Sequence, residues 1–251
     1  MELRIVHLYY NLMNIYGDDG NIICLKKRAL WRGIRPIVKK ISIGDEIDSD
    51  WGDIYFLGGG QDRQQIIVSE DLMGPNGERL KEAKEKGAVF FSICGGYQLL
   101  GHYYKPHNAP EIKGLGILDV YTIAGEKRLI QNIIVKINPH LDIKGKFNTL
   151  VGFENHSGKT YLLEKASPLG EVMIGGGNNS EDKTEGAFEG NVFGCYLHGP
   201  CLPKNPHFAD FLISKALSRR YGEISLKPID DTLEWATHEN ILKRFGKGKI
   251  K

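Results

Sequence analysis

Residues 88–101 constrain the fold of this chain more than any other stretch. The first five, Ala-Val-Phe-Phe-Ser, are largely apolar, which is typical of a short buried strand. Gly95 and Gly96 then permit a tight turn, and the residues after them begin a helix. A strand, a sharp turn and a helix with a nucleophile at the turn form a nucleophile elbow, here with Cys94 in place of Ser. The pattern therefore predicts a thiol presented where a strand ends.

The position of Cys94 at a helix start also favours its reactive form. The helix dipole and the unpaired N–H groups of the first turn stabilise a thiolate. Glycine at positions 95 and 96 keeps side chains away from an incoming substrate and from the packing of the helix. A buried cysteine before an ordinary glycine-rich turn would give the same pattern. Both interpretations stay open from this stretch alone.

The first hundred residues alternate between strand and helix patterns. Strands are expected over residues 4–8, 35–41, 51–57 and 88–92. Residues 16–21 read as a turn whose Asp side chains can cap a helix, which continues to Gly33. Residues 62–86 look helical with a break at Gly74-Pro75. Buried strands alternating with helices predict an α/β fold with a mostly parallel, doubly wound sheet.

The second half of the chain is richer in strand patterns. We expect strands over residues 116–123, 130–137, 150–154, 171–174 and 191–197, which form an antiparallel, strand-rich portion. Asn205 and Pro206 read as a helix cap and first turn, and a last helix follows Asp230 and Asp231. Since no linker separates the two halves, residues 1–251 are expected to form a single domain.

Composition narrows the class of protein. The chain is 41% hydrophobic and 25% charged, as in a soluble globular protein with a proper core. A net charge of +2 argues against a dedicated nucleic-acid binder, and the basic tail from Lys243 to Lys251 reads as a solvated terminus. We see neither a signal peptide nor an apolar run that could insert in a membrane. With four irregularly spaced cysteines, we expect reduced thiols and a cytoplasmic location.

His198 is a candidate partner for Cys94. It ends the strand pattern of residues 191–197 and precedes Gly199-Pro200, at the edge where an α/β sheet presents its active site. A neutral imidazole near a thiol can act as base and then as acid. Cys195, His198 and Cys201 also have ligand-like spacing for zinc. However, strand alternation puts Cys195 on the opposite face and a fourth ligand is missing, so no metal site is expected.

Residues 58–60, three consecutive glycines, end another predicted strand. Bare backbone N–H groups at such a position can point at a developing oxyanion. A flexible turn is the alternative reading of an isolated triple glycine.

Together these features resemble a known family. Four blocks carry the resemblance: residues 12–21 (LMNIYGDDGN), 57–62 (LGGGQD), 152–158 (GFENHSG) and 196–206 (YLHGPCLPKNP). They are similar to the class I glutamine amidotransferases of the cobyric-acid-synthase type. Within these, they are most similar to free-standing glutaminase subunits that pair with a synthetase. Residues 125–128 (GEKR) look like the same pattern.

The resemblance implies a role for particular residues. Cys94 would be the nucleophile and His198 the general base and acid. The oxyanion hole would combine the N–H of Gly95 with one from Gly59 or Gly60. The ends of the glutamine would be held by Gln98, Arg128 and a turn made of Asn155, His156 and Ser157.

One departure concerns the residue that orients the imidazole. Many class I glutaminases carry His-x-Glu, but here Pro200 stands two positions after His198. The cobyric-acid-synthase type also lacks that acid. We therefore hypothesise that the synthetase supplies the missing carboxylate, so that the isolated chain is a weak glutaminase.

The resemblance also implies a reaction and a partner. The chain would hydrolyse L-glutamine and deliver ammonia to a MurT-like, ATP-dependent synthetase in a heterodimer. That Mur-ligase-like partner would amidate the α-carboxylate of D-glutamate in lipid II. No cofactor is expected in this chain, since ATP and magnesium belong to the partner. Three alternatives stay open: a glutaminase for another synthetase such as a corrinoid one, a stand-alone γ-glutamyl cysteine hydrolase, and a non-enzymatic binding module.

Overall fold

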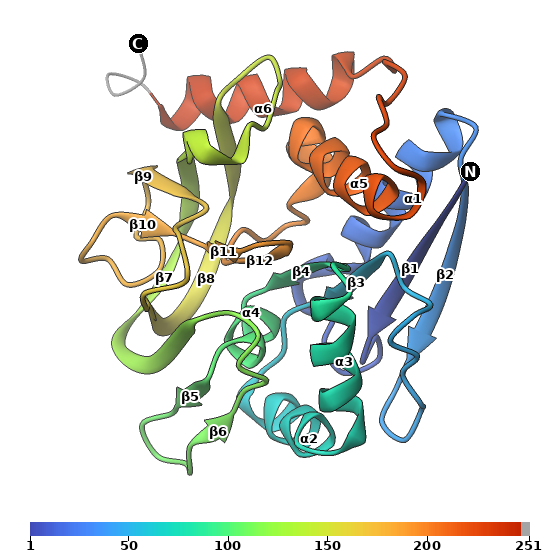
Figure 1. Cartoon of the computed structure of the whole chain (residues 1–251). Helices are drawn as coiled ribbons and strands as arrows, with labels where there is room; N and C mark the ends of the chain where they lie inside the picture. The colour runs from blue at the N-terminus through green and yellow to red at the C-terminus, as the bar shows by residue number, and fades with distance from the viewer. Residues whose placement is uncertain (247–251) are drawn as a thin grey trace.

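The computed structural model of the chain describes residues 1–246. It contains two six-stranded sheets, and helices cover both faces of the mostly parallel one (Figure 1). The part of the predicted basic tail from residue 247 onward lies outside the described residues.

The mostly parallel sheet confirms the predicted α/β fold. Five of its strands run parallel: β2 (Arg35–Ile41), β1 (Glu2–Leu8), β3 (Ile54–Leu57), β4 (Val89–Ile93) and β12 (Val192–Cys195). The antiparallel strand β11 (Ala187–Glu189) closes the edge beside β12. The strand order places β4 directly between β3 and β12. Because parallel strands end at one edge, the residues that follow these three strands come together there.

Helices cover both faces of this sheet. On one side, α1 (Asp19–Trp31) and α5 (Pro206–Tyr221) pack together and against its strands. The other side carries α2 (Asp62–Leu72), α3 (Pro75–Glu85) and the short α4 (Gly95–Leu100) (Figure 1). The last helix, α6 (Thr232–Phe245), packs against β8 and a short helical turn, η3 (Leu202–Lys204). The predicted break at Gly74-Pro75 is confirmed, since α3 begins at that proline.

The second sheet extends further than the sequence pattern suggested. Its strands are β5 (Tyr103–Lys105), β6 (Ile112–Lys113), β7 (Val120–Ile137), β8 (Thr149–Leu162), β9 (Gly170–Ile174) and β10 (Thr184–Glu185). The predicted strands 116–123 and 130–137 are one strand, β7, and the predicted strand 150–154 continues to Leu162. Residues 155–157 are therefore not a turn, because β8 stays paired with β7 on both sides of them.

The pairing of β7 with β8 contains one large irregularity. Ala124 pairs with Gly158 and Leu129 pairs with His156, so residues 125–128 stand opposite a single residue, Ser157. A bulge of this kind redirects side chains near functional sites. It places Arg128 beside the ends of β4 and β12, where the site described below lies.

Two predicted helix caps are not formed. Neither Asp18 nor Asn205 uses its side chain to cap the helix that follows it. Asn205 instead bonds the backbone N–H and C=O of Val151 in β8. Asp18 turns toward Gly59, and Asn14 accepts the first N–H of α1 in its place. The predicted helix start at Asn205 and Pro206 is confirmed, but the side-chain caps are absent because long-range partners outweigh a local cap.

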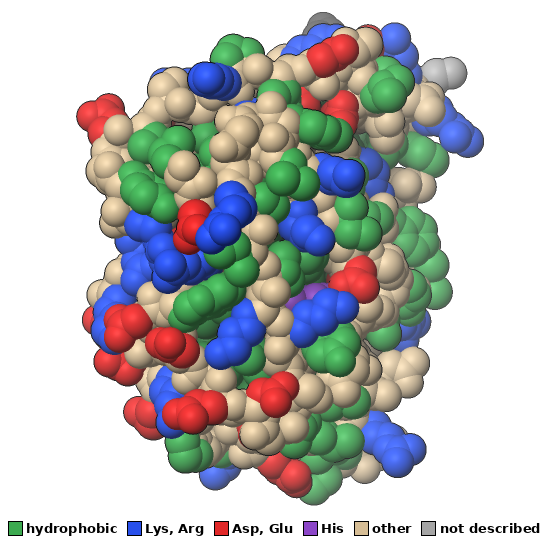
Figure 2. Space-filling view, turned by 90° about the vertical axis from the view of Figure 1, so that its right-hand side faces the viewer, with side chains coloured by type: hydrophobic (Ala, Val, Ile, Leu, Met, Phe, Trp, Pro, Cys, Tyr) green, Lys and Arg blue, Asp and Glu red, His purple; other side chains and the backbone are tan. Residues whose placement is uncertain are grey.

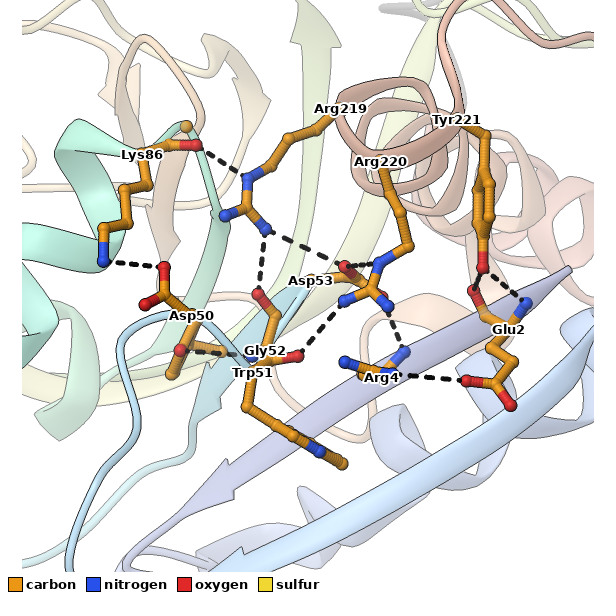
Figure 3. Close-up of polar contacts among 12 residues, drawn as sticks. Glu2, Arg4, Asp50, Trp51, Gly52, Asp53, Lys86, Arg219, Arg220 and Tyr221 are labelled. Carbon is orange, nitrogen blue, oxygen red and sulfur yellow. Dashed lines mark hydrogen bonds and ion pairs between the residues drawn. The ribbon is translucent and has the colours of Figure 1, made fainter.

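A polar cluster lies at the amino ends of the strands of the mostly parallel sheet (Figure 3). The carboxylate of Asp53, fully buried at the start of β3, accepts from Arg220 of α5 at 2.8 Å and from the N–H of Arg4 at 2.8 Å. Arg219 donates to the carbonyl oxygens of Lys86 and Gly52. These contacts anchor the end of α5 to the amino ends of the strands, far from the elbow.

The surface around α1 and β2 is mixed in character. Lys and Arg side chains are interspersed there with hydrophobic and some acidic ones (Figure 2). Three large apolar side chains of α1, Ile23, Leu30 and Trp31, are half exposed or more. Of the helices in residues 1–246, none has both the length and the apolar character needed to cross a membrane.

Candidate active site

The predicted elbow at Cys94 is confirmed by the backbone. Cys94 has φ 53° and ψ −110° between β4 and α4, a conformation that costs an L-residue about 1–3 kcal/mol. A Cβ on Gly96 would lie 2.4 Å from the carbonyl oxygen of Leu57, and one on Gly95 would lie 2.8 Å from that of Gly60. Both glycines are therefore needed for α4 to pack against the end of β3 and carry the thiol at this bend.

His198 reaches the same edge from the neighbouring strand. β12 pairs in parallel with β4, and the backbone of His198 then exchanges hydrogen bonds with Phe153 of β8 at 2.9 and 3.2 Å. Its imidazole is fully buried, and the ring of Tyr16 lies edge-on 4.9 Å away. Tyr16 sits in the short helical turn η1 (Ile15–Gly17) that precedes α1.

A carboxylate of this same chain lies beside the imidazole. Asp18 Oδ1 is 3.6 Å from Nδ1 of His198, while Asp18 Oδ2 accepts the N–H of Gly59 at 2.6 Å. Burial lowers the pKa of His198, but Asp18 and Cys94 together outweigh it and raise that pKa to about 10. The imidazole is therefore protonated at neutral pH, between an acid and the thiol.

Asp18 corrects the expectation that this chain lacks a group to orient His198. The two residues are far apart in the sequence, and Asp18 has the local pattern of a helix cap. They meet because the segment before α1 lies against Gly59, which follows β3, and against His198, which follows β12. No spacing in the sequence signals this contact.

The backbone geometry favours Gly60 over Gly59 for an oxyanion hole. The N–H of Gly59 is taken by Asp18. The N atom of Gly60 lies 2.9 Å from the point that a Cβ of Gly95 would occupy, and within residues 1–246 no acceptor bonds its N–H. The N–H groups of Gly60 and Gly95 are thus close neighbours beside Cys94.

A cavity of about 360 Å³ opens at Cys94. Its walls include every residue that the resemblance assigned to glutamine binding: Gln98, Arg128, Asn155, His156 and Ser157. They come from α4 and from the bulged part of the second sheet. A larger cavity, of about 790 Å³ near Lys136 and Lys183, contains none of them. The thiol therefore lies in a pocket of its own, large enough for an amino acid.

Arg128 crosses this pocket from the β7 bulge. Its Nε donates to Asn155 Oδ1 at 2.7 Å, and its Nη2 lies 3.4 Å from the hydroxyl of Tyr16. A planar guanidinium held in this way can pair with a carboxylate through two hydrogen bonds.

Tyr196 contacts Gln98 and His156, two residues of the pocket wall, and it was not among the predicted site residues. Its hydroxyl accepts from Gln98 Nε2 at 3.0 Å, and its ring stacks on His156 with centroids 3.6 Å apart. Burial lowers the pKa of His156 to about 4, and its Nδ1–H donates to Gly158 at 2.8 Å. His156 is thus a neutral side chain that packs and donates. The only signal for Tyr196 was its place in the block 196–206.

In the described part of the chain, Cys195, His198 and Cys201 do not form a zinc site. Cys195 interacts with Cys201, and burial raises the pKa of the Cys195 thiol well above its usual range. Within the part of the chain that is described, no group of three or more His, Cys, Asp or Glu side chains is arranged to hold a metal ion.

Comparison with known proteins identifies the family of this chain. The model of the CobB/CobQ-like glutamine amidotransferase domain matches residues 4–206. The chain is 41% identical over 248 residues to the GatD subunit of lipid II isoglutaminyl synthase (glutamine-hydrolyzing) from Staphylococcus aureus, covering 99% of this chain and 98% of that one. Its identity to the GatD subunit from Streptococcus pneumoniae is 42%, over 92% of this chain and 87% of that one.

More distant similarities show the same fold. A probable cobyric acid synthase from Methanococcus vannielii is 32% identical over 90% of this chain, which covers 45% of that longer protein. Among solved structures, PurLQS from Thermotoga maritima matches with a TM-score of 0.56 at 16% identity, over 87% of this chain and 97% of that one. The chain therefore belongs to the CobB/CobQ-like glutamine amidotransferases, in the GatD group.

Proposed function

We propose that this chain hydrolyses L-glutamine to glutamate and ammonia through a thioester on Cys94. The thiolate of Cys94 attacks the carboxamide carbon, and the N–H groups of Gly95 and Gly60 hold the oxygen as it gains charge. His198 then donates its proton to the departing nitrogen, and the C–N bond breaks to release ammonia. A water molecule next gives a proton to His198 and attacks the thioester carbon, which frees glutamate and restores the thiolate and the protonated imidazole.

The observation that carries this proposal is the arrangement of Cys94, His198 and Asp18 at one edge of the sheet. A strained backbone presents the thiol, and a buried acid lies 3.6 Å from the imidazole that serves it. In this proposal, Arg128 binds the α-carboxylate of glutamine. Gln98, Asn155 and Ser157 face the remainder of the amino acid, and His156 supports them.

We further propose that ammonia passes to a MurT-like, ATP-dependent synthetase in a heterodimer. The acceptor is the α-carboxylate of D-glutamate in lipid II, and ATP and magnesium act in the partner. The names of the two GatD relatives support this proposal, because similarity extends over almost the whole of both chains. The reaction would take place in the cytoplasm.

The Cys94→Ser variant tests both parts. In complex with the synthetase, it should lose glutamine-driven amidation of lipid II, while amidation driven by an ammonium salt should persist. The wild-type complex should use both nitrogen sources. If the variant still released ammonia from glutamine, the thioester mechanism would be wrong. If the wild-type complex amidated nothing with either source, the assignment of the acceptor would be wrong.

A second candidate is a glutaminase that serves a corrinoid-amidating synthetase. It is favoured by the 32% identity to a probable cobyric acid synthase. That relative is about twice as long as the matched region, so a separate synthetase would have to supply the other half. Offering the purified complex a corrinoid acid and lipid II in parallel separates the two candidates.

A further inference from the structure

A buried acid that the proposed mechanism does not use lies behind the pocket. Glu185 is completely buried in β10, where it pairs with Gly170 of β9. The chain then crosses to the mostly parallel sheet, and Ala187 pairs with Gly194 of β12. Gly186 makes this crossing with φ +60°. Glu185 thus stands at the junction of the two sheets.

The carboxyl group of Glu185 replaces a missing strand partner. Its Oε1 accepts the backbone N–H of Tyr196 at 2.7 Å, just beyond the end of β12. The β11 partner strand reaches only to Gly194, so this N–H has no strand opposite it. The other oxygen, Oε2, is buried and has no hydrogen-bond partner among residues 1–246. An unpaired oxygen of a buried carboxylate costs more free energy than the unpaired hydroxyl of a neutral acid, so these surroundings favour the uncharged form.

Tyr196 connects this contact to the pocket. Its hydroxyl bonds Gln98 at 3.0 Å and Thr160 at 2.6 Å, and its ring stacks on His156. It also lies two residues before His198 on the same extended segment. A shift of the Tyr196 backbone would therefore move both the imidazole and two walls of the pocket.

We propose that Glu185 is a positioning residue, which as an uncharged acid holds the end of β12 so that Tyr196 and His198 meet glutamine correctly. This inference rests on the proposed glutaminase function. It assigns a role in that reaction to a residue that touches neither the substrate nor the thiol.

The charges around Glu185 agree with an uncharged side chain. Burial raises its pKa to about 8, with Glu154 of β8 adding to the effect and the N–H groups of Tyr196 and Gly186 and the charge of His198 opposing it. The other titratable groups facing it are Tyr97 of α4 and Cys195 of β12, both buried. Glu185 is thus mostly neutral at pH 7, and it gains a charge as the pH rises through about 8.

Two substitutions separate the hydrogen bond from the charge. Glu185→Gln keeps an oxygen for the N–H of Tyr196 and is isosteric with the neutral acid, so it should rescue kcat/KM to within about threefold of wild type at pH 7. Glu185→Leu removes the acceptor and should lower kcat/KM about 10- to 100-fold. We expect kcat to fall and KM to rise, because the imidazole and the pocket both move. Asp53→Asn, which alters a buried carboxylate at the far edge of the sheet, is the matched control and should leave both constants unchanged.

The assay is ammonia release by the chain in complex with its synthetase, together with the rate at which acivicin alkylates Cys94. The ratio of Glu185→Gln to wild-type activity should rise as the pH increases from 7 to 9, because only the wild type gains the buried charge. Equal losses in the Gln and Leu variants, a Leu variant with wild-type constants, or a ratio that stays flat with pH would each overturn the inference.

Different results would contradict the proposed glutaminase function. If Cys94→Ser retained ammonia release and no alkylation of Cys94 occurred in the wild type, the glutaminase mechanism itself would be wrong. If Cys94→Ser is inactive while Glu185→Leu behaves like the wild type, only the role of Glu185 is wrong.

Discussion

The carboxylate of Asp18 lies 3.6 Å from Nδ1 of His198, and both side chains are completely buried. Because the N–H of Gly59 fixes the other oxygen of Asp18, the acid is held in place before any substrate or partner arrives. A buried acid next to a protonated imidazole stabilises its charge and sets its orientation. This chain therefore contains its own candidate for the third member of a Cys-His-Asp group.

Replacing Asp18 with Asn should lower kcat of the glutaminase by about 100-fold or more. Asn keeps an oxygen for the N–H of Gly59 but no longer stabilises the imidazolium, so the pKa of His198 should fall. The pH dependence of kcat would report that fall. Asp19→Asn is the matched control, because Asp19 is half exposed and lies near His7 instead. Unchanged kinetics in Asp18→Asn would favour the hypothesis that the synthetase supplies the acid.

Replacing Arg128 with Lys should raise KM for glutamine about tenfold and change kcat much less. A lysine keeps the charge but cannot form two parallel bonds to a carboxylate or bridge to Asn155 in the same geometry. Steady-state kinetics with L-glutamine measures the effect. Lys127→Ala, at the exposed neighbouring position of the bulge, should leave KM as it is. A larger loss in kcat than in KM would argue against a binding role for Arg128.

Replacing Gly96 with Ala should destabilise the fold by about 1–3 kcal/mol and abolish glutaminase activity. The new methyl group would meet the backbone oxygens of Leu57 and Gly58 at 2.4 and 2.6 Å, which forces α4 and Cys94 to move. Gly190→Ala also imposes strain, at φ +60°, but meets no atoms within 4 Å. It should lose stability and keep its activity. Chemical denaturation and the ammonia assay together test this pair.

Replacing Arg28 with Met should lower the free energy of unfolding by about 3 kcal/mol. Arg28 is only 1% exposed and bonds both Asp210 of α5 and Asp231 before α6, so its loss leaves two partly buried acids with less compensation. Urea denaturation measures the change. Arg79→Met removes an exposed ion pair with Glu46 and should cost less than about 1 kcal/mol. Similar losses in both variants would contradict a special role for the buried cluster.

We expect buried neutral histidines to lower the free energy of unfolding in mild acid. Burial lowers the pKa of His207 from its ordinary value of 6.5 to about 3, and the nearby His238 adds to the effect. Since the unfolded chain takes up this proton below pH 6.5 and the folded chain does not, stability is lost as the pH falls from 6.5 toward 3. The wild type should therefore lose stability relative to His207→Gln over this range. Denaturation curves at pH 7.5, 6 and 5 would show it, and parallel curves for the two proteins would refute it.

Much of the fold could be predicted because local patterns and tertiary packing agree. The strands around Phe56 and Phe91 are almost entirely apolar, as parallel strands buried on both faces require. Prediction failed where pairing with a distant strand decided the structure. Asn155 is a residue type that is common in turns. It nevertheless stays in β8, because it pairs with Ile130 of β7.

The residues of the candidate site were likewise predictable only in part. Cys94 and the glycines after it form an elbow through local backbone geometry, so the residues themselves reveal it. His198 was a candidate from its place at the end of a strand, whereas Gln98 and Arg128 were assigned through resemblance. The structure places Gln98 and Arg128 in the walls of the pocket at Cys94. Tyr196 was missed, because a tyrosine near the end of a strand is an ordinary core residue until its hydrogen-bond partners are known.

By itself, the sequence determined the alternation of strands and helices, the position of the bend that carries the thiol, and the family. These depend on residues close together in the chain, where periodicity and glycine placement act directly. The tertiary structure alone decided that Asp18 faces His198 instead of capping α1, and that Glu185 holds the N–H of Tyr196. Each of these polar groups could satisfy itself locally or at a distance, and only the packing of the two sheets makes the distant partner the better one.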